Sequence, residues 1–166
     1  FGGQAVVRVR PMASLSTQIA YAWSRAQRKD PGATRWRLFD FDQTHVLNAI
    51  VGWNHRSGVE LGGRASLSSG FPRTAVVSSV PNVRTGGFDP VFGSHNGERL
   101  PLFFELSARV GWRHRAAWGE LRTWLDLQNA THRANAHEFF YSADFARRGI
   151  VRGLPILPLL GLEVRT

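Results

Sequence analysis

The segment HRANAHE, residues 132–138, gathers side-chain types that bind zinc. His132, His137 and Glu138 could each supply a ligand, because zinc takes imidazole nitrogens and carboxylate oxygens. Their spacing matches no helical metalloprotease motif, and a loop gives the three side chains no fixed geometry. The chain has no cysteine, so thiolate metal sites and disulfides are excluded. We therefore expect a polar loop here and no metal site.

The remaining reactive side chains form no recognisable catalytic group. No Ser–His–Asp arrangement stands out, and the pair Gly86-Gly87 lacks the strand–turn–helix context of a phosphate loop. The pair Gly62-Gly63 lies within a predicted strand, where it either relieves crowding or marks a bulge. The sequence predicts neither an enzyme nor a bound cofactor.

One set of charged residues alternates in sign across segments that we expect to be neighbouring strands. Opposite charges that face each other across two strands stabilise one another. We therefore expect mutual pairing at this set rather than ligand binding. The candidate residues are Glu60, Arg64, Glu105, Arg109, Glu120, Arg122 and Asp126.

The formal net charge of +9 does not indicate a nucleic-acid-binding protein. The arginines are scattered, and their densest groups, 25–29 and 113–115, lie between patterned segments. This distribution indicates charge in loops and turns that face solvent or lipid headgroups.

The elements that carry these residues alternate apolar and polar positions, which predicts strands with one apolar face. In the segment 14–24, for example, Leu15, Ile19 and Trp23 share one face. Most of the patterned segments are about 9–11 residues long. This is long for a strand of a soluble protein and matches a tilted strand that crosses a bilayer. The predicted strands span 4–10, 14–24, 43–53, 58–68, 103–113, 118–128 and 154–166.

Short and long connections alternate strictly between these strands. In an up-and-down sheet every second connection lies at the same end. One end therefore carries only turns and the other only large loops, which is typical of outer-membrane barrels. The short connections are 11–13, 54–57 and 114–117, and the long ones are 25–42, 69–102 and 129–153.

Aromatic residues of the apolar faces fall at both ends of the strands. Trp53 and Trp112 adjoin short turns, whereas Tyr21, Trp23 and Phe104 adjoin long loops. They would form two aromatic girdles at the membrane interfaces. The alternative is that they fill the core of a soluble barrel.

A bacterial single-chain barrel usually has an even number of strands. Seven strands would also leave two open edges inside lipid, which is not tolerated. We therefore expect further strands before Phe1. The chain would then be the C-terminal part of a larger barrel, and its last strand would close that barrel.

Several segments together resemble TonB-dependent outer-membrane receptors. The segment 154–166, LPILPLLGLEVRT, is similar to the closing strand of that family, although Thr166 stands where an aromatic residue is usual. The segment 96–112 is similar to the family's Asn…Arg-x-Pro approach to a late strand, except that Ser107 stands where Asp is common. Looser similarities cover 19–28, 39–53 with Asp42 and His45, and 123–133 with Asn129.

This resemblance implies an all-β, antiparallel up-and-down transmembrane β-barrel of about 22 strands. Residues 1–166 would form roughly its last seven strands, while the plug domain would lie upstream of this chain. The implied function is active uptake of a scarce nutrient, such as a metal–siderophore complex, across the outer membrane. The implied partners are outer-membrane lipid, the upstream strands, the plug domain and the TonB energy-coupling complex.

Within that implied barrel, the charged set would face the lumen and contact the plug. The long loop 69–102 would meet the substrate, with Arg73, Arg84, Asp89, His95 and Asn96. Two other classes of protein stay open. One is a passive outer-membrane porin or structural barrel, and the other is a soluble β-barrel binding module.

Overall fold

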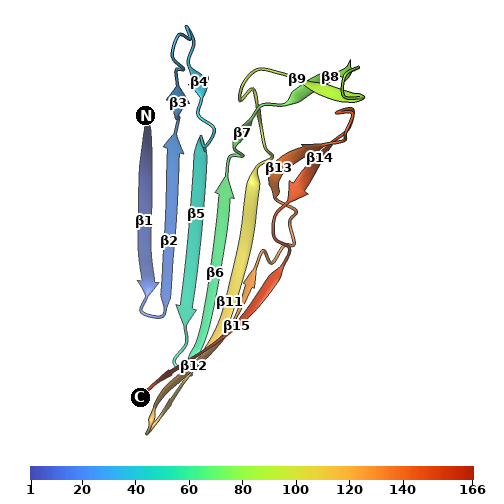
Figure 1. Ribbon diagram of the computed structural model, residues 1–166. Coiled ribbons are helices and arrows are strands. Elements are labelled where there is room, and N and C mark those ends of the chain that lie inside the picture. Colours follow the sequence, from blue (N-terminus) through green and yellow to red (C-terminus); the bar gives the residue numbers. More distant parts are fainter.

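The protein is a single curved layer of β-structure without any helix. The computed structural model describes all residues from 1 to 166, and its main sheet has seven antiparallel strands in the order β1-β2-β5-β6-β11-β12-β15 (Figure 1). Since this order follows the chain, the prediction of an all-β, antiparallel up-and-down sheet is confirmed. The strands are β1 (Gly2–Met12), β2 (Leu15–Ser24), β5 (His45–Asn54), β6 (Val59–Ser68), β11 (Phe103–Ala116), β12 (Gly119–Gln128) and β15 (Leu157–Arg165).

The prediction of a connection over 114–117 is wrong in extent. Ala116 pairs with Gly119, so the turn between β11 and β12 consists of Ala117 and Trp118 alone. The polar residues 113–115 at the end of β11 interrupt the alternation, so the sequence pattern did not show that the strand continues. The register also runs unbroken through Gly62, which excludes the predicted alternative of a bulge at that site.

The sheet separates its residues into an apolar face and a polar face. Cross-strand neighbours on the apolar face form continuous rows because the register joins apolar positions from strand to strand. One such row contains Val7, Ile19, Ala49, Ala65 and Leu106. No second layer covers this face, and Ala75 and Leu100, both in a long loop, are the only buried hydrophobic residues of the chain.

The long connections fold into small hairpins at one end of the sheet, opposite the short turns (Figure 1). The predicted alternation of short turns and long loops is confirmed, whereas the hairpins within the loops were not predicted. They pair β3 (Gln27–Arg28) with β4 (Arg37–Leu38), β7 (Pro72–Arg73) with β10 (Glu98–Arg99), β8 (Val76–Asn82) with β9 (Gly87–Phe92), and β13 (Ala136–Tyr141) with β14 (Arg148–Arg152).

The main sheet is open. β1 and β15 lie at its two edges, and each pairs with one neighbour only. The sheet bends across its width, from the nearly upright β1 and β2 to the strongly inclined β12 and β15 (Figure 1). The structure contains no helix that is long and apolar enough to cross a membrane.

Candidate functional site

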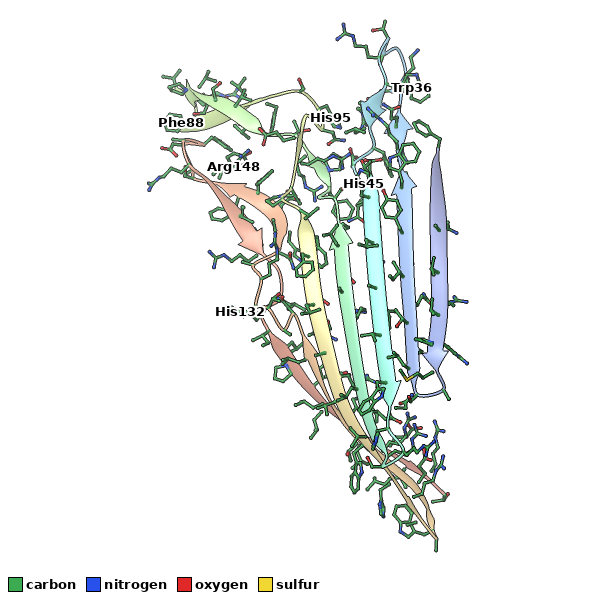
Figure 2. The ribbon with its side chains drawn as sticks, turned by 180° about the vertical axis from the view of Figure 1, so that it is seen from behind. Trp36, His45, Phe88, His95, His132 and Arg148 are labelled. Carbon is green, nitrogen blue, oxygen red and sulfur yellow. The ribbon has the colours of Figure 1, made fainter.

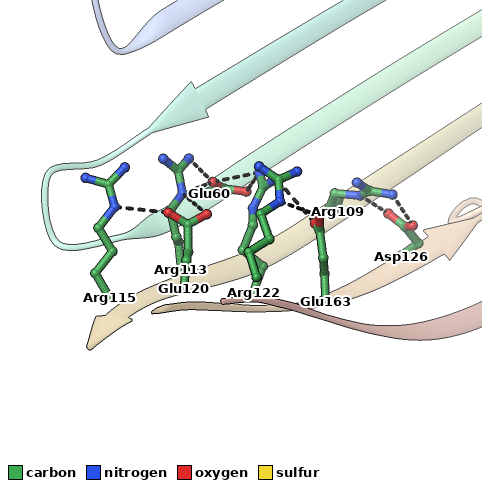
Figure 3. A network of polar contacts seen from close by, with 9 residues as sticks. Glu60, Arg109, Arg113, Arg115, Glu120, Arg122, Asp126 and Glu163 are labelled. Carbon is green, nitrogen blue, oxygen red and sulfur yellow. Dashed lines mark hydrogen bonds and ion pairs between the residues drawn. The ribbon is translucent and has the colours of Figure 1, made fainter. Parts of the chain in front are cut away.

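The polar face carries a network of ion pairs around Glu60 near the short turns (Figure 3). Arg113 of β11 and Arg122 of β12 both donate hydrogen bonds to the Glu60 carboxylate, and Arg122 lies 3.0 Å from its Oε2. Directly opposite Glu60 is Gly111, which has no side chain and so leaves room for these guanidinium groups. Arg122 also lies 3.6 Å from Glu163 of β15. The network therefore connects four neighbouring strands.

This network extends to the β11–β12 turn. Glu120 accepts a hydrogen bond of 3.0 Å from Arg115, and its other carboxylate oxygen lies 4.0 Å from Arg113. Arg165 pairs with Glu163 at 2.7 Å (both residues lie on β15). Every carboxylate at this end of the polar face thus has an arginine partner.

Two further ion pairs lie toward the middle of the polar face. Arg109 and Asp126 are direct cross-strand neighbours, and two parallel hydrogen bonds join them in a fork. Arg64 reaches diagonally to Glu105 at 3.1 Å, and the Ser107 hydroxyl donates to the same carboxylate. Both pairs are partly exposed, so each contributes little to stability.

The predicted charged residues all lie on this one face, and each pairs with an opposite charge. Six of the seven pair with one another, as the prediction of mutual pairing requires, whereas Glu120 pairs with Arg115 from outside the set. The candidate set omitted Arg113, Arg115 and Glu163. Arg113 and Arg115 could have been found, because they share the parity of Arg109 along the same strand.

An aromatic side chain lies among these charges. The Trp124 ring covers Gly161 of the edge strand β15 so closely that a Cβ atom at Gly161 would collide with the ring. The Arg109 guanidinium lies 5.4 Å from the ring centroid, within the range of a cation–π interaction. An indole ring over a strand glycine holds the edge strand in register.

At the loop end, Asp42 is fully buried and joins two long loops. Its carboxylate accepts hydrogen bonds from Arg99, from the Ala26 backbone N–H at 2.6 Å and from the Thr44 hydroxyl at 2.9 Å. Burial opposes the charge of Asp42, but these hydrogen bonds outweigh it and lower the pKa of the carboxyl group. Arg99 also donates to the Gly70 carbonyl, so it ties both loops to the top of the sheet.

Asn96 makes a second connection between the same loops. Its side-chain amide donates to the Leu38 carbonyl at 2.8 Å and to Asp40. His95 lies 3.4 Å from the same Asp40 carboxylate. The hydrogen bond from Asn96, together with His95 and Arg37, lowers the pKa of Asp40.

The third long loop joins this assembly through its hairpin, β13–β14. Glu138 pairs with Arg73 at 2.7 Å, and the Tyr141 hydroxyl accepts a hydrogen bond from the Val76 backbone N–H. Arg148, which is labelled in Figure 2, pairs with Glu98 at 2.6 Å. All three long loops therefore form one connected cap at the end of the sheet.

Most of the loop residues predicted to meet a substrate are instead paired or buried within this cap. Arg73 is paired with Glu138, Asp89 accepts a hydrogen bond from Asn82, and Asn96 is buried. His95 is half exposed beside Asp40, and the guanidinium of Arg84 has no hydrogen-bond partner. Sequence reasoning missed Asp42 and Arg99 as a pair, although both stand in the segments that carry the family resemblance.

The three candidate zinc ligands lie with separate partners. Glu138 is held by Arg73, and the His132 Nδ1 accepts a hydrogen bond of 3.3 Å from the Ile156 backbone N–H. His137 lies against Gly153. No group of three or more His, Asp or Glu side chains gathers into a metal site.

Comparisons of the chain with protein-family models, with curated proteins and with solved structures gave no significant match.

Proposed function

We propose that this chain is part of the wall of an outer-membrane β-barrel of the TonB-dependent transporter type, which takes up a scarce nutrient such as a metal–siderophore complex. The observation that carries the proposal is the apolar face of the main sheet. It extends over all seven strands without a second layer. A soluble protein rarely exposes an apolar patch larger than a few hundred Å².

The dimensions of this face fit a bilayer. Phe104 and Trp112 lie on the apolar face of β11, eight positions apart, which corresponds to about 27 Å at about 3.4 Å per residue. The apolar band of an outer-membrane barrel is about 25 Å tall and is flanked by aromatic residues. Leu160 and Leu162 on β15 are 85% and 67% exposed, as expected of side chains that contact lipid.

The open edges support a larger barrel. The outer backbone groups of β1 and β15 have no strand partner in this chain. Such edges are not tolerated in the hydrocarbon region, so strands from the rest of the protein would pair with them. In this arrangement the polar face lines the lumen, and the connected loops cover its outer mouth.

The lumen wall offers a place for a plug domain to bind. A shallow hollow of about 250 Å³ lies between Gly62, Arg64, Ser107 and Arg109. The two arginine side chains are 51% and 52% exposed, so they can bind polar groups of another segment. The plug domain and the contacts with the TonB complex would belong to the part of the protein upstream of this chain.

A passive porin is the second candidate. It is favoured by the ion pairs of the polar face, which neutralise one another without a plug. Energy dependence separates the two functions, because only TonB-dependent uptake stops when an uncoupler collapses the inner-membrane potential.

The first test uses the full-length protein extracted from outer membranes. On a gel, we expect a band that moves differently before and after heating, because a folded barrel resists detergent. Uptake of the cognate nutrient should then stop on addition of an uncoupler. A protein that stays monomeric and soluble without detergent, and shows no heat shift, would contradict the membrane assignment and favour the soluble binding module.

A further inference from the structure

The pattern Gly-Trp-x-His-Arg occurs twice in the chain, as GWNHR at 52–56 and as GWRHR at 111–115. Both copies end strands that run toward the short turns, the first at the end of β5 and the second at the end of β11. The register places Trp53 beside Leu61 and Trp112 beside Val59, so both indoles lie on the apolar face. The two copies therefore occupy equivalent positions in the sheet.

Each tryptophan packs against the histidine two residues later. The ring centroids of Trp53 and His55 are 5.2 Å apart, and those of Trp112 and His114 are 5.3 Å apart. The interplanar angles are also similar, 33° and 37°. Both imidazoles are exposed. The same local structure has thus formed twice at one end of the apolar face.

The fold brings the two copies next to each other. The Arg113 backbone N–H donates a hydrogen bond of 2.8 Å to the Gly58 carbonyl, which attaches the β5–β6 turn to β11. A Cβ atom at Gly58 would lie 3.5 Å from the indole nitrogen of Trp112. The turn that carries His55 and Arg56 therefore lies beside the second Trp–His pair.

The basic side chains of this turn-end cluster, which comprises Trp53, His55, Arg56, Trp112 and His114, have no acidic partner. Arg56 and His114 make no side-chain hydrogen bond or ion pair, and the only hydrogen-bond partner of the His55 ring is Ser57, through its hydroxyl at 2.8 Å and its backbone N–H at 3.3 Å. On the opposite face of the same sheet end, by contrast, Arg113 and Arg115 are paired with Glu60 and Glu120. Positive charge is thus neutralised on the polar face and left free at the border of the apolar face.

We propose that the turn-end cluster binds the phosphate of an anionic phospholipid in the leaflet that faces the short turns. The inference rests on the proposed function, because it requires the apolar face to contact lipid. Arg56 would hold the phosphate by charge-assisted hydrogen bonds, and the two imidazoles would add donors. Trp53 and Trp112 would contact the glycerol and upper acyl region, where indoles prefer to lie. This apolar contact selects a lipid over free phosphate.

The test measures lipid preference at the protein surface. The full-length protein is reconstituted in bilayers, and spin-labelled phosphatidylglycerol is compared with spin-labelled phosphatidylcholine for association with it. One cation at a membrane surface corresponds to about a fivefold preference for an anionic lipid. We expect Arg56→Gln to lower the preference about fivefold and His114→Gln to lower it further. The matched control, Arg84→Gln, removes the same charge from the exposed tip of a long loop and should leave the preference unchanged.

Three results would overturn the inference. They are an equal association of both lipids with the wild-type protein, an equal effect of Arg56→Gln and Arg84→Gln, and full displacement of the labelled lipid by inorganic phosphate. The heat shift of each variant on a gel checks its folding. If the wild-type protein enters the bilayer but shows no lipid preference, the inference alone fails. If it does not enter the bilayer, the proposed function fails as well.

Discussion

At the scale of single residues, Asp42 is the only buried charged residue of the chain, so its charge depends on the hydrogen bonds around it. Its side chain is fully buried, and Arg99 is its ionic partner. Removing one member of a buried pair costs about 3–5 kcal/mol, because the other charge is left without a partner. Arg99 is 29% exposed, so the lower end of this range applies here. We expect Asp42→Asn to accelerate amide exchange of the loop bases around residues 26 and 39–45 roughly a hundredfold, measured by hydrogen–deuterium exchange. The control Asp30→Asn, in an exposed pair with Arg37, should change exchange much less.

Acid should have the same effect on the wild-type loop bases. Because the pKa of Asp42 is lowered in the folded protein, its carboxylate stabilises the loops above the ordinary pKa of 3.8. That contribution is lost as the pH falls through the lowered pKa. After correction for intrinsic rates, protection of the Ala26 amide should therefore decrease below about pH 4. Protection that is independent of pH in this range would contradict the role given to Asp42.

The close packing of Trp124 over Gly161 allows a prediction about stability. An alanine Cβ at this position would collide with the Trp124 ring, which would have to move off the edge strand. We expect Gly161→Ala to lower the free energy of unfolding by about 1–3 kcal/mol, measured by urea titration of the reconstituted protein. Gly3 is the matched control, because it lies on the other edge strand and has open space around its Cβ position. Equal losses for Gly3→Ala and Gly161→Ala would show that the Trp124 contact is unimportant.

At the scale of elements, the two faces of the sheet should respond oppositely to an added charge. Leu106 on β11 lies beside Ala65 on the apolar face, whereas Ser66 lies beside Glu105 on the polar face. An arginine in the middle of a lipid-facing strand costs about 2–4 kcal/mol. We expect Leu106→Arg to lower the unfolding free energy by that amount, and Ser66→Arg to be tolerated because Glu105 can pair with it. Similar losses in both variants would exclude a lipid-facing position for Leu106.

The seven long strands could be predicted from sequence because period-two alternation is strong over nine or more residues. The loop hairpins could not, because strands as short as β3 and β7 carry too few residues to show a period. The pairing of Asp42 with Arg99 spans 57 positions of the chain, and no local pattern indicates so distant a contact. The charged face was predictable as a set because alternation fixes the face of each residue. Its exact partners depend on register, which the sequence pattern leaves open.

At the scale of the whole molecule, the sheet has two unlike ends that should lie on opposite sides of the membrane. The absence of cysteine from this chain allows single cysteines to report on each end. Val83, at the tip of the β8–β9 hairpin, is 101% exposed, and Ala13 is exposed in the short β1–β2 turn. We expect a membrane-impermeant maleimide to label Val83→Cys on intact cells, and to label Ala13→Cys only after the outer membrane is permeabilised. Labelling of both positions on intact cells would mean that the chain does not cross the membrane, whereas the reverse pattern would invert the proposed orientation of the loops.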